Sequence, residues 1–213
     1  MSVTDRTVVL AGATSASGLA LASALQDAGA RVVATGRSAE RLAPLKDAGV
    51  QIEVADATSL DHMTALASRL ESVDGVIPLV GGWRGGGGLA GQSDDDFDAL
   101  LPALAAVRAT SRAFDARLRA SGAGRFAIVS STAVGRPLAG GANYAAIKAG
   151  SEAWTLAVAQ GYAKSARDAG EPLRTASVVF RAKALDTAAL VPAVLSLWDV
   201  DAAKLNDRII DLL

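Results

Sequence analysis

A tyrosine and a lysine at helical spacing form the clearest chemical signal in the sequence. Tyr144 and Lys148 are four positions apart, so on a helix both side chains lie on one face. An ammonium beside a phenol favours the phenolate and lowers the pKa of the tyrosine, which is otherwise a poor acid or base near neutral pH. Such a tyrosine donates a proton to a carbonyl oxygen or takes one from an alcohol. Ser131 ends the preceding β-branched run, where its hydroxyl can hold that oxygen by a hydrogen bond.

The turn at residues 11–18 has the composition of a phosphate-binding loop. It follows a short apolar run and precedes an alanine-rich segment with helical periodicity. Gly12 permits a tight exit from the strand, and Gly18 allows the start of the helix to lie close to a ligand and to the sheet. The N–H groups and the macrodipole at a helix start then favour a pyrophosphate.

The end of the second apolar run carries a positive charge where an acid would serve NAD(H). There is no acid at Gly36, and Arg37 offers a guanidinium fork that suits a 2′-phosphate. An acid at this point would instead accept hydrogen bonds from an adenosine ribose. We therefore expect NADP(H) to be preferred, with NAD(H) as the alternative cofactor. The competing interpretation is that Arg37 is a solvated residue at the start of a helix.

These residues lie where short apolar runs alternate with longer alanine-rich runs. The alternation predicts parallel strands joined by right-handed helical crossovers, and nearly continuous apolar strands are typical of a sheet covered on both faces. We therefore predict a Rossmann-type doubly wound α/β sheet of about seven strands in a single domain, residues 1–213. The predicted strands are 7–11, 31–35, 50–54, 75–80, 125–130, 175–180 and 208–212. The predicted helices are 15–27, 39–48, 60–70, 94–120, 143–167 and a short one near 188–198.

Composition excludes several other classes of function. The formal net charge is −1, which argues against the basic face that nucleic-acid binding requires. There is no cysteine, so disulfides and thiol chemistry are excluded. We interpret His62, the single histidine, as a solvated residue of a surface helix. Asp94, Asp95 and Asp96 look like a metal cluster, but acids are common at helix starts, and we expect Ser93 to cap one here. We expect no metal site.

The sequence carries no targeting or membrane signal. Residues 1–6 lack the charged-then-apolar layout of a signal peptide. No uninterrupted apolar run reaches the roughly 18 residues that a membrane span needs. We therefore expect a cytoplasmic protein that acts on a small molecule, with neither a membrane nor a nucleic acid as partner.

Together, the glycine turn, the serine pair at the end of the fifth strand and the Tyr-Lys helix resemble the short-chain dehydrogenase/reductase family over nearly the whole chain. The turn is similar to that family's pattern of glycine, three residues, glycine, one residue, glycine, with Ala16 at the middle glycine. The resemblance implies that Tyr144 is the catalytic acid/base, that Lys148 supports it and binds the nicotinamide ribose, and that Ser131 orients the substrate. It places an adenine contact at Asp56, for which capping the next helix is the competing role. The predicted cofactor-binding residues are Gly12, Thr14, Ser15, Ala16, Ser17, Gly18, Arg37, Ser38, Asp56, Ala57, Val80, Gly81, Gly82, Lys148 and Thr187.

Two features of the first half of the chain depart from that family's pattern. The stretch Pro78–Gly81 keeps only the glycine of the family's Asn-Asn-Ala-Gly, although its backbone can still border the cofactor. The family's helix asparagine, which joins the proton relay, falls near Ala103 or Leu104, and neither can take that role.

The C-terminal part departs as well. Phe180-Arg181 replaces the family's Pro-Gly, and Thr187 is the candidate for its nicotinamide-contacting threonine. The segment after Thr187 is too short for the family's helical lid. The substrate pocket is therefore expected to be open, or to be closed by a partner subunit or by the 81–91 loop.

The loop after the fourth strand resembles one group within that family. Gly81-Gly82-Trp83 is similar to the Gly-Gly-Trp loop of the dihydropteridine reductases within that family, whereas Arg37 and Ser131 differ from them. Trp83 is expected either to stack on a flat substrate or nicotinamide, or to be a hydrophobic plug that fixes the loop. Three cations, at Arg84, Arg181 and Lys183, are either receptors for an anionic substrate group or solvated surface charges.

These features favour an NADP(H)-dependent oxidoreductase that reduces a carbonyl or oxidises an alcohol of a small molecule. One alternative is a non-redox enzyme on the same fold, such as a dehydratase or epimerase, with Tyr144 as acid/base. Another is a dinucleotide-sensing regulatory protein without turnover. The helices at 94–120 and 143–167 carry apolar stripes that include Trp154, Val158 and Tyr162, from which we predict a homodimer or homotetramer.

Overall fold

A seven-stranded parallel sheet forms the centre of the computed structural model, which describes residues 2–183 and 186–212. The strand order is β3-β2-β1-β4-β5-β6-β7, and every neighbouring pair is parallel. The central strands are buried on both faces, which explains their continuous apolar sequences. The predicted doubly wound fold is thus confirmed. The strands are β1 (Thr7–Ala11), β2 (Arg31–Gly36), β3 (Gln51–Val54), β4 (Gly75–Pro78), β5 (Arg125–Ser131), β6 (Ala176–Ala182) and β7 (Arg208–Leu212).

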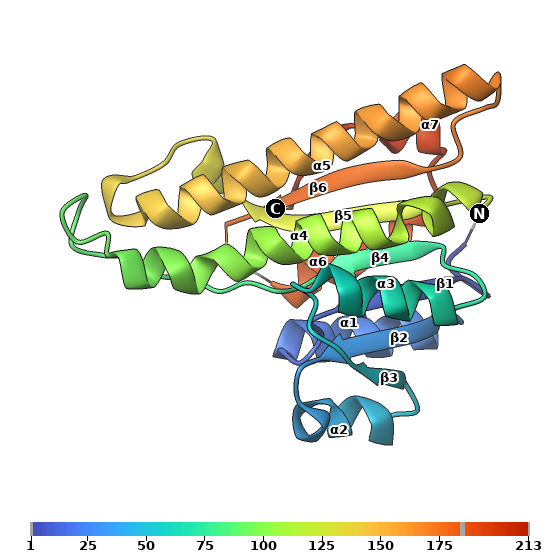
Figure 1. Cartoon of the computed structure of the whole chain (residues 1–213), viewed down its shortest axis with the longest axis horizontal. Coiled ribbons are helices and arrows are strands. Elements are labelled where there is room, and N and C mark those ends of the chain that lie inside the picture. Colours follow the sequence, from blue (N-terminus) through green and yellow to red (C-terminus); the bar gives the residue numbers. More distant parts are fainter. Residues whose placement is uncertain (1, 184–185, 213) are drawn as a thin grey trace.

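Helices cover both faces of the sheet (Figure 1). One apolar cluster joins the sheet to α3, α4 and α5, and a second joins the opposite face to α1, α2 and α6. The α-helices are α1 (Ala16–Asp27), α2 (Ala39–Asp47), α3 (Leu60–Arg69), α4 (Asp94–Ala120), α5 (Ala142–Ala169), α6 (Thr187–Leu195) and α7 (Ala202–Leu205). Short 3₁₀ turns are η1 (Thr132–Val134), η2 (Ala139–Gly141) and η3 (Ser196–Trp198). The two long helices α4 and α5 lie side by side (Figure 1).

Serine side chains begin four of these helices. Ser15, Ser38, Ser59 and Ser93 each accept a hydrogen bond from the backbone N–H three residues further on. Such caps satisfy one of the N–H groups that a helix start leaves without an intrahelical partner. The predicted cap at Ser93 is confirmed, and its three aspartates form the first turn of α4.

The C-terminal elements differ in their bounds from the prediction. β6 runs to Ala182 rather than ending at Phe180, because Arg181 and Ala182 still pair with β5 on one side and β7 on the other. The predicted final helix is divided into α6 and η3. Trp198 at the end of η3 is buried and donates from Nε1 to the carbonyl of Ala123, 3.1 Å away.

The apolar stripe proposed for subunit contact has a different role in part. Tyr162 is buried, in the same cluster as Phe114 and Phe126, and Trp154 and Val158 pack partly buried against that cluster. Tyr162 therefore covers this chain's own sheet, so the prediction that it belongs to a surplus apolar surface is wrong, whereas Trp154 and Val158 keep part of their surface exposed. Among the described residues, no helix is long and apolar enough to cross a membrane.

Candidate active site

Two adjoining cavities lie beyond the carboxyl ends of β1 and β4, where the strand order reverses. The first has a volume of about 340 Å³ and the second of about 890 Å³. Four residues line both of them: Ser15, Leu79, Val80 and Gly81. An extended ligand can therefore pass from one cavity into the other along the turns that follow β1 and β4.

Two glycines of the first turn are required by close backbone packing. Gly12 has a φ of +84°, and a Cβ there would lie 2.6 Å from Cγ2 of Val80. A Cβ on Gly18 would lie 2.3 Å from the carbonyl oxygen of Ala13, which holds the start of α1 against the turn. The predicted reasons for both glycines agree with this geometry.

The start of α1 explains how the glycine-rich loop after β1 tolerates alanine at position 16. Ala16 is the first helical residue and is exposed, so its methyl group lies on regular helix rather than in a tight bend. The side chain of Ser15 accepts the N–H of Gly18 at 3.2 Å. The other N–H groups of this turn have no intrahelical acceptor and remain available to an anion.

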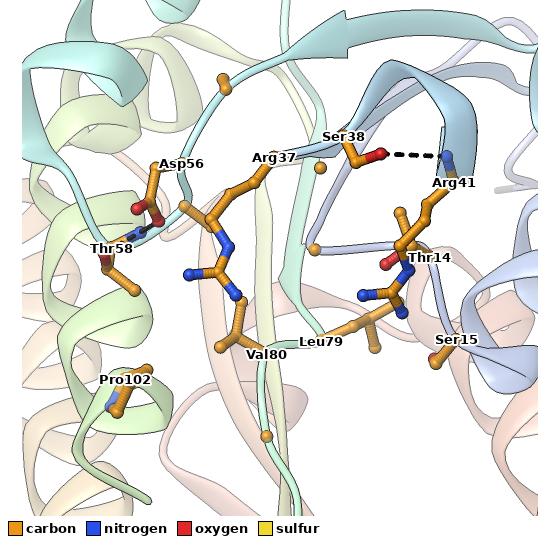
Figure 2. Close-up of a pocket in the computed structure, with 15 residues that line it drawn as sticks. Thr14, Ser15, Arg37, Ser38, Arg41, Asp56, Thr58, Leu79, Val80 and Pro102 are labelled. Carbon is orange, nitrogen blue, oxygen red and sulfur yellow. Dashed lines mark hydrogen bonds between the residues drawn. The ribbon is translucent and has the colours of Figure 1, made fainter. Parts of the chain in front are cut away.

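Two arginines extend into the first cavity. Arg37 follows β2, Arg41 lies in the first turn of α2, and both line the cavity. Figure 2 shows their side chains extending in the same direction, with Asp56 to one side and Ser15 to the other. Ser38 caps α2 by accepting the N–H of Arg41 at 3.3 Å, which fixes the start of that helix. The sequence prediction missed Arg41, although its place four residues after Arg37 was a usable signal.

Asp56 lies in the first cavity but does not cap a helix. Its Oδ1 accepts both the backbone N–H and the hydroxyl of Thr58, at 2.9 and 2.8 Å, while Ser59 is the cap of α3. The competing cap role is therefore wrong, because the carboxylate closes its own turn ahead of the helix. Burial raises the pKa of Asp56, but the Thr58 hydrogen bonds and the charge of Arg37 outweigh it and leave the pKa below its usual value. His62, on the exposed surface of α3 as expected, accepts the N–H of Asp56 at 3.1 Å.

The predicted cofactor residues divide among three places. Those that line the first cavity are Gly12, Thr14, Ser15, Arg37, Ser38, Asp56, Ala57, Val80 and Gly81. Gly82 and Lys148 line the second cavity. Ala16, Ser17, Gly18 and Thr187 line neither: the first three form the start of α1, and Thr187 begins α6 after the Asp186 cap.

The three predicted catalytic side chains line the second cavity together. Ser131 comes from the end of β5, and Tyr144 and Lys148 come from the first turns of α5. Nζ of Lys148 lies 5.8 Å from the centre of the Tyr144 ring and donates to the carbonyl of Val129 at 2.8 Å. Oγ of Ser131 accepts the N–H of Ala133 at 3.2 Å, so its own proton is directed elsewhere.

Burial has a large effect on the lysine. It lowers the pKa of Lys148 from its usual 10.5 to about 8, and the nearby carboxylate of Glu152 opposes this shift. At neutral pH the ammonium therefore remains the main form of Lys148. The side of Tyr144 that faces α4 is apolar, since it packs in a cluster with Ala103 and Leu104. Neither Ala103 nor Leu104 offers a polar group beside Tyr144.

A buried carboxylate that the sequence prediction missed lies beyond the lysine. Glu152 is four residues after Lys148 and accepts from Nε and Nη2 of Arg181, at 2.8 and 2.6 Å. It also accepts the hydroxyl of Ser130, at 2.6 Å. The i, i+4 spacing from Lys148 was a signal for Glu152, but its distant partner Arg181 had none.

The glycine-rich loop after β4 is tied to the segment between β5 and α5. The N–H of Gly86 donates to the carbonyl of Gly140 at 2.7 Å, and a Cβ on Gly85 would lie 2.4 Å from the same oxygen. Nε2 of Gln92 donates to carbonyls on both segments, including that of Gly140 at 3.1 Å. Trp83 lines the cavity and remains 63% exposed, which favours the predicted stacking role over the predicted hydrophobic plug.

Comparison with known proteins identifies the family and the fold. Residues 6–166 match the model of the short chain dehydrogenases. The chain belongs to the short-chain dehydrogenase family. No curated protein sequence gives a match. Within the short-chain dehydrogenase family, the likeness of Gly81-Gly82-Trp83 to the loop of dihydropteridine reductases stays a prediction.

Solved structures share the fold over nearly their whole length. A short-chain type dehydrogenase/reductase from Mycobacterium ulcerans is 16% identical, with a TM-score of 0.85 over 100% of this chain and 90% of that chain. A Shigella flexneri 2a str. 301 structure complexed with NADP is 19% identical, with a TM-score of 0.84 over 99% and 98%. A gluconate 5-dehydrogenase from Burkholderia cenocepacia J2315 in complex with NADP and tartrate is 19% identical, with a TM-score of 0.80 over 98% and 93%. At these identities the likeness establishes the fold of a short-chain dehydrogenase.

Proposed function

We propose that this chain is an NADP(H)-dependent oxidoreductase that interconverts a small-molecule carbonyl compound and its alcohol. The observation that carries the proposal is the continuity of the two cavities. The cavity that contains Arg37 and the cavity that contains Tyr144 share the residues Ser15, Leu79, Val80 and Gly81. A dinucleotide laid across them would have its adenosine end at the arginines and its nicotinamide end at the tyrosine.

The residues of the first cavity fit an NADP cofactor. A Cβ at Gly12 or Gly18 would overlap neighbouring atoms, so the turn keeps the start of α1 close to the sheet, where its N–H groups suit a pyrophosphate. Arg37 and Arg41 place two guanidinium groups beside the end of β2, where they suit the 2′-phosphate that distinguishes NADP from NAD. The NADP-bound relatives of the same fold support the same choice.

The second cavity supplies the proton chemistry. Tyr144 donates a proton to the carbonyl oxygen in reduction and takes it back from the alcohol in oxidation. The ammonium of Lys148, held against the carbonyl of Val129, lowers the free energy of the phenolate that remains. Ser131 has a hydroxyl proton to donate to the same substrate oxygen, which fixes the carbonyl beside the tyrosine. NADP(H), when bound, supplies or accepts the hydride.

The first experiment is a titration of the purified protein with NADPH and with NADH, followed by nicotinamide fluorescence. Tighter binding of NADPH is expected, and a screen of carbonyl compounds should then reveal loss of NADPH absorbance. Tyr144→Phe should abolish this turnover while the affinity for NADPH is kept. NADPH binding without turnover of any carbonyl compound favours a dinucleotide-sensing protein, and turnover without net change in NADPH favours non-redox chemistry.

We also expect the chain to act as a homodimer or homotetramer through the outer surfaces of α4 and α5, the long helices that lie side by side at one face. Light scattering should give a multiple of the chain mass. A monomer at working concentration contradicts this part of the proposal.

A further inference from the structure

The charged groups that face the second cavity all have the same sign. Its described lining contains Arg136, Lys148 and Lys183, and it contains no aspartate or glutamate. Lys148 is already engaged with the carbonyl of Val129 and serves Tyr144. Two cations therefore remain for a bound molecule, Arg136 between η1 and η2 and Lys183 directly after β6.

Two other cations considered as anion receptors, Arg84 and Arg181, are paired with carboxylates of the chain. Arg84 lies 3.7 Å from Oδ1 of Asp96, and Arg181 is held by both oxygens of Glu152. Neither arginine lines the cavity. By contrast, within residues 2–183 and 186–212, Arg136 and Lys183 form no ion pair and no side-chain hydrogen bond. Of the three cations considered as anion receptors from the sequence, only Lys183 faces the cavity, and Arg136 was missed.

The cavity also has an apolar rim that is held in place. Trp83 and Leu138 line it and are 63% and 72% exposed, so their apolar surface is available to a ligand. They belong to the two segments that the Gly86 to Gly140 hydrogen bond and the Gln92 side chain tie together. A flat or aliphatic part of a ligand that covers Trp83 and Leu138 removes apolar surface from water.

From this distribution we infer that the substrate is a carbonyl compound, or its alcohol, that carries an acidic group and an apolar or planar part. The inference rests on the proposed function and names the substrate class of the same site. Arg136 and Lys183 receive the carboxylate or phosphate of the substrate by charge-assisted hydrogen bonds, while Tyr144 and Ser131 hold the carbonyl oxygen. The volume of about 890 Å³ accommodates such a molecule together with a nicotinamide ring.

The binding test uses 1-naphthoate and the neutral 1-naphthamide, which differ in charge but little in shape, with the protein saturated in NADP⁺. The naphthoate should bind about tenfold more tightly, the effect of one charge-assisted hydrogen bond, and the difference should shrink as salt is raised. Arg136→Gln combined with Lys183→Gln should remove the preference. Arg84→Gln is the matched control, because it removes a neighbouring cation that already has Asp96, and it should keep the preference. Equal binding of the two compounds by the native protein overturns the inference.

The kinetic test compares a panel of keto acids with their methyl esters in the presence of NADPH. The acids should have a kcat/KM at least about tenfold above that of the esters, and the double variant should lose this advantage mainly through KM. Esters turned over as well as the acids overturn the inference but leave the oxidoreductase proposal intact. NADPH binding with no turnover of any compound overturns the proposed function instead, and the naphthoate measurement still decides whether the cavity selects anions.

Discussion

Arg181, near the end of β6, and Glu152, in α5 four residues after Lys148, form a bidentate ion pair. Nε and Nη2 of Arg181 donate to Oε1 and Oε2 of Glu152 at 2.8 and 2.6 Å, and Ser130 donates to Oε1 as well. The side chain of Glu152 is only 5% exposed. The carboxylate thus ties the strand that ends in Ser131 to the helix that carries Lys148.

Removal of this carboxylate charge should destabilise the protein. Glu152→Gln leaves Arg181 without its partner, and because the Arg181 side chain is 23% exposed, we expect a loss of about 1–3 kcal/mol rather than the ~3–5 kcal/mol of a fully buried pair. Urea unfolding measures the loss. The double variant Glu152→Gln with Arg181→Met should be less destabilised than the sum of the two single variants. Additive losses contradict a direct coupling between the two side chains.

A methyl group at Gly18 should disturb both stability and cofactor binding. The added Cβ would lie 2.3 Å from the carbonyl oxygen of Ala13, so α1 must move away from the turn. We expect Gly18→Ala to cost about 1–3 kcal/mol of unfolding free energy and to weaken NADPH binding. Gly161→Ala is the control, since that glycine lies inside α5 with nothing within 4 Å of the added atom, and it should stabilise by roughly 0.5–1 kcal/mol. Equal effects at the two glycines argue against the packing explanation.

Both arginines of the first cavity should contribute to the choice of cofactor. Each of Arg37→Gln and Arg41→Gln should weaken NADPH binding by about tenfold or more, the effect of losing a charge-assisted hydrogen bond, and should leave NADH binding nearly unchanged. Fluorescence titration with each nucleotide measures both affinities. Arg167→Gln, near the end of α5 remote from the cavities, should change neither. A NADPH affinity that survives the double variant Arg37→Gln, Arg41→Gln would sink the assignment of the 2′-phosphate site.

The buried lysine predicts a pH dependence of stability. The folded-state pKa of Lys148 is about 8 and its usual value is 10.5, so between these values the unfolded chain binds a proton that the folded chain has released. The unfolding free energy from this group therefore rises with pH above about 8, by at most ~1.4 kcal/mol per pH unit. Urea unfolding from pH 7 to 9.5 should show the wild type gaining stability relative to Lys148→Met. The control is Lys164→Met, which removes an exposed lysine paired with Asp168 and keeps Lys148, so its stability relative to the wild type should not change over this pH range.

Much of the local structure could be predicted from the sequence. Ser93 predicted the start of α4, because a cap bonds an N–H only three residues away, and Ser15, Ser38 and Ser59 cap α1, α2 and α3 in the same local way. The i, i+4 spacing placed Tyr144 and Lys148 on one face of α5, and the alternation of apolar runs with helices predicted the order of the elements. Each of these signals depends on residues close together in the chain.

Other features depended on contacts between distant segments, and only the tertiary structure decided them. Arg181 was an open candidate for anion binding until β6 brought it to Glu152, 29 positions away in sequence. The strand reversal between β1 and β4 joined the cavity of Arg37 to that of Tyr144. The directions of the side chains left Arg136 facing the cavity of Tyr144, whereas Arg84 lies beside Asp96. The sequence alone determined which charges exist and which elements carry them. Which charges neutralise one another was set by the folded backbone, because Coulomb energies and hydrogen bonds depend on distances of a few ångströms that sequence separation does not encode.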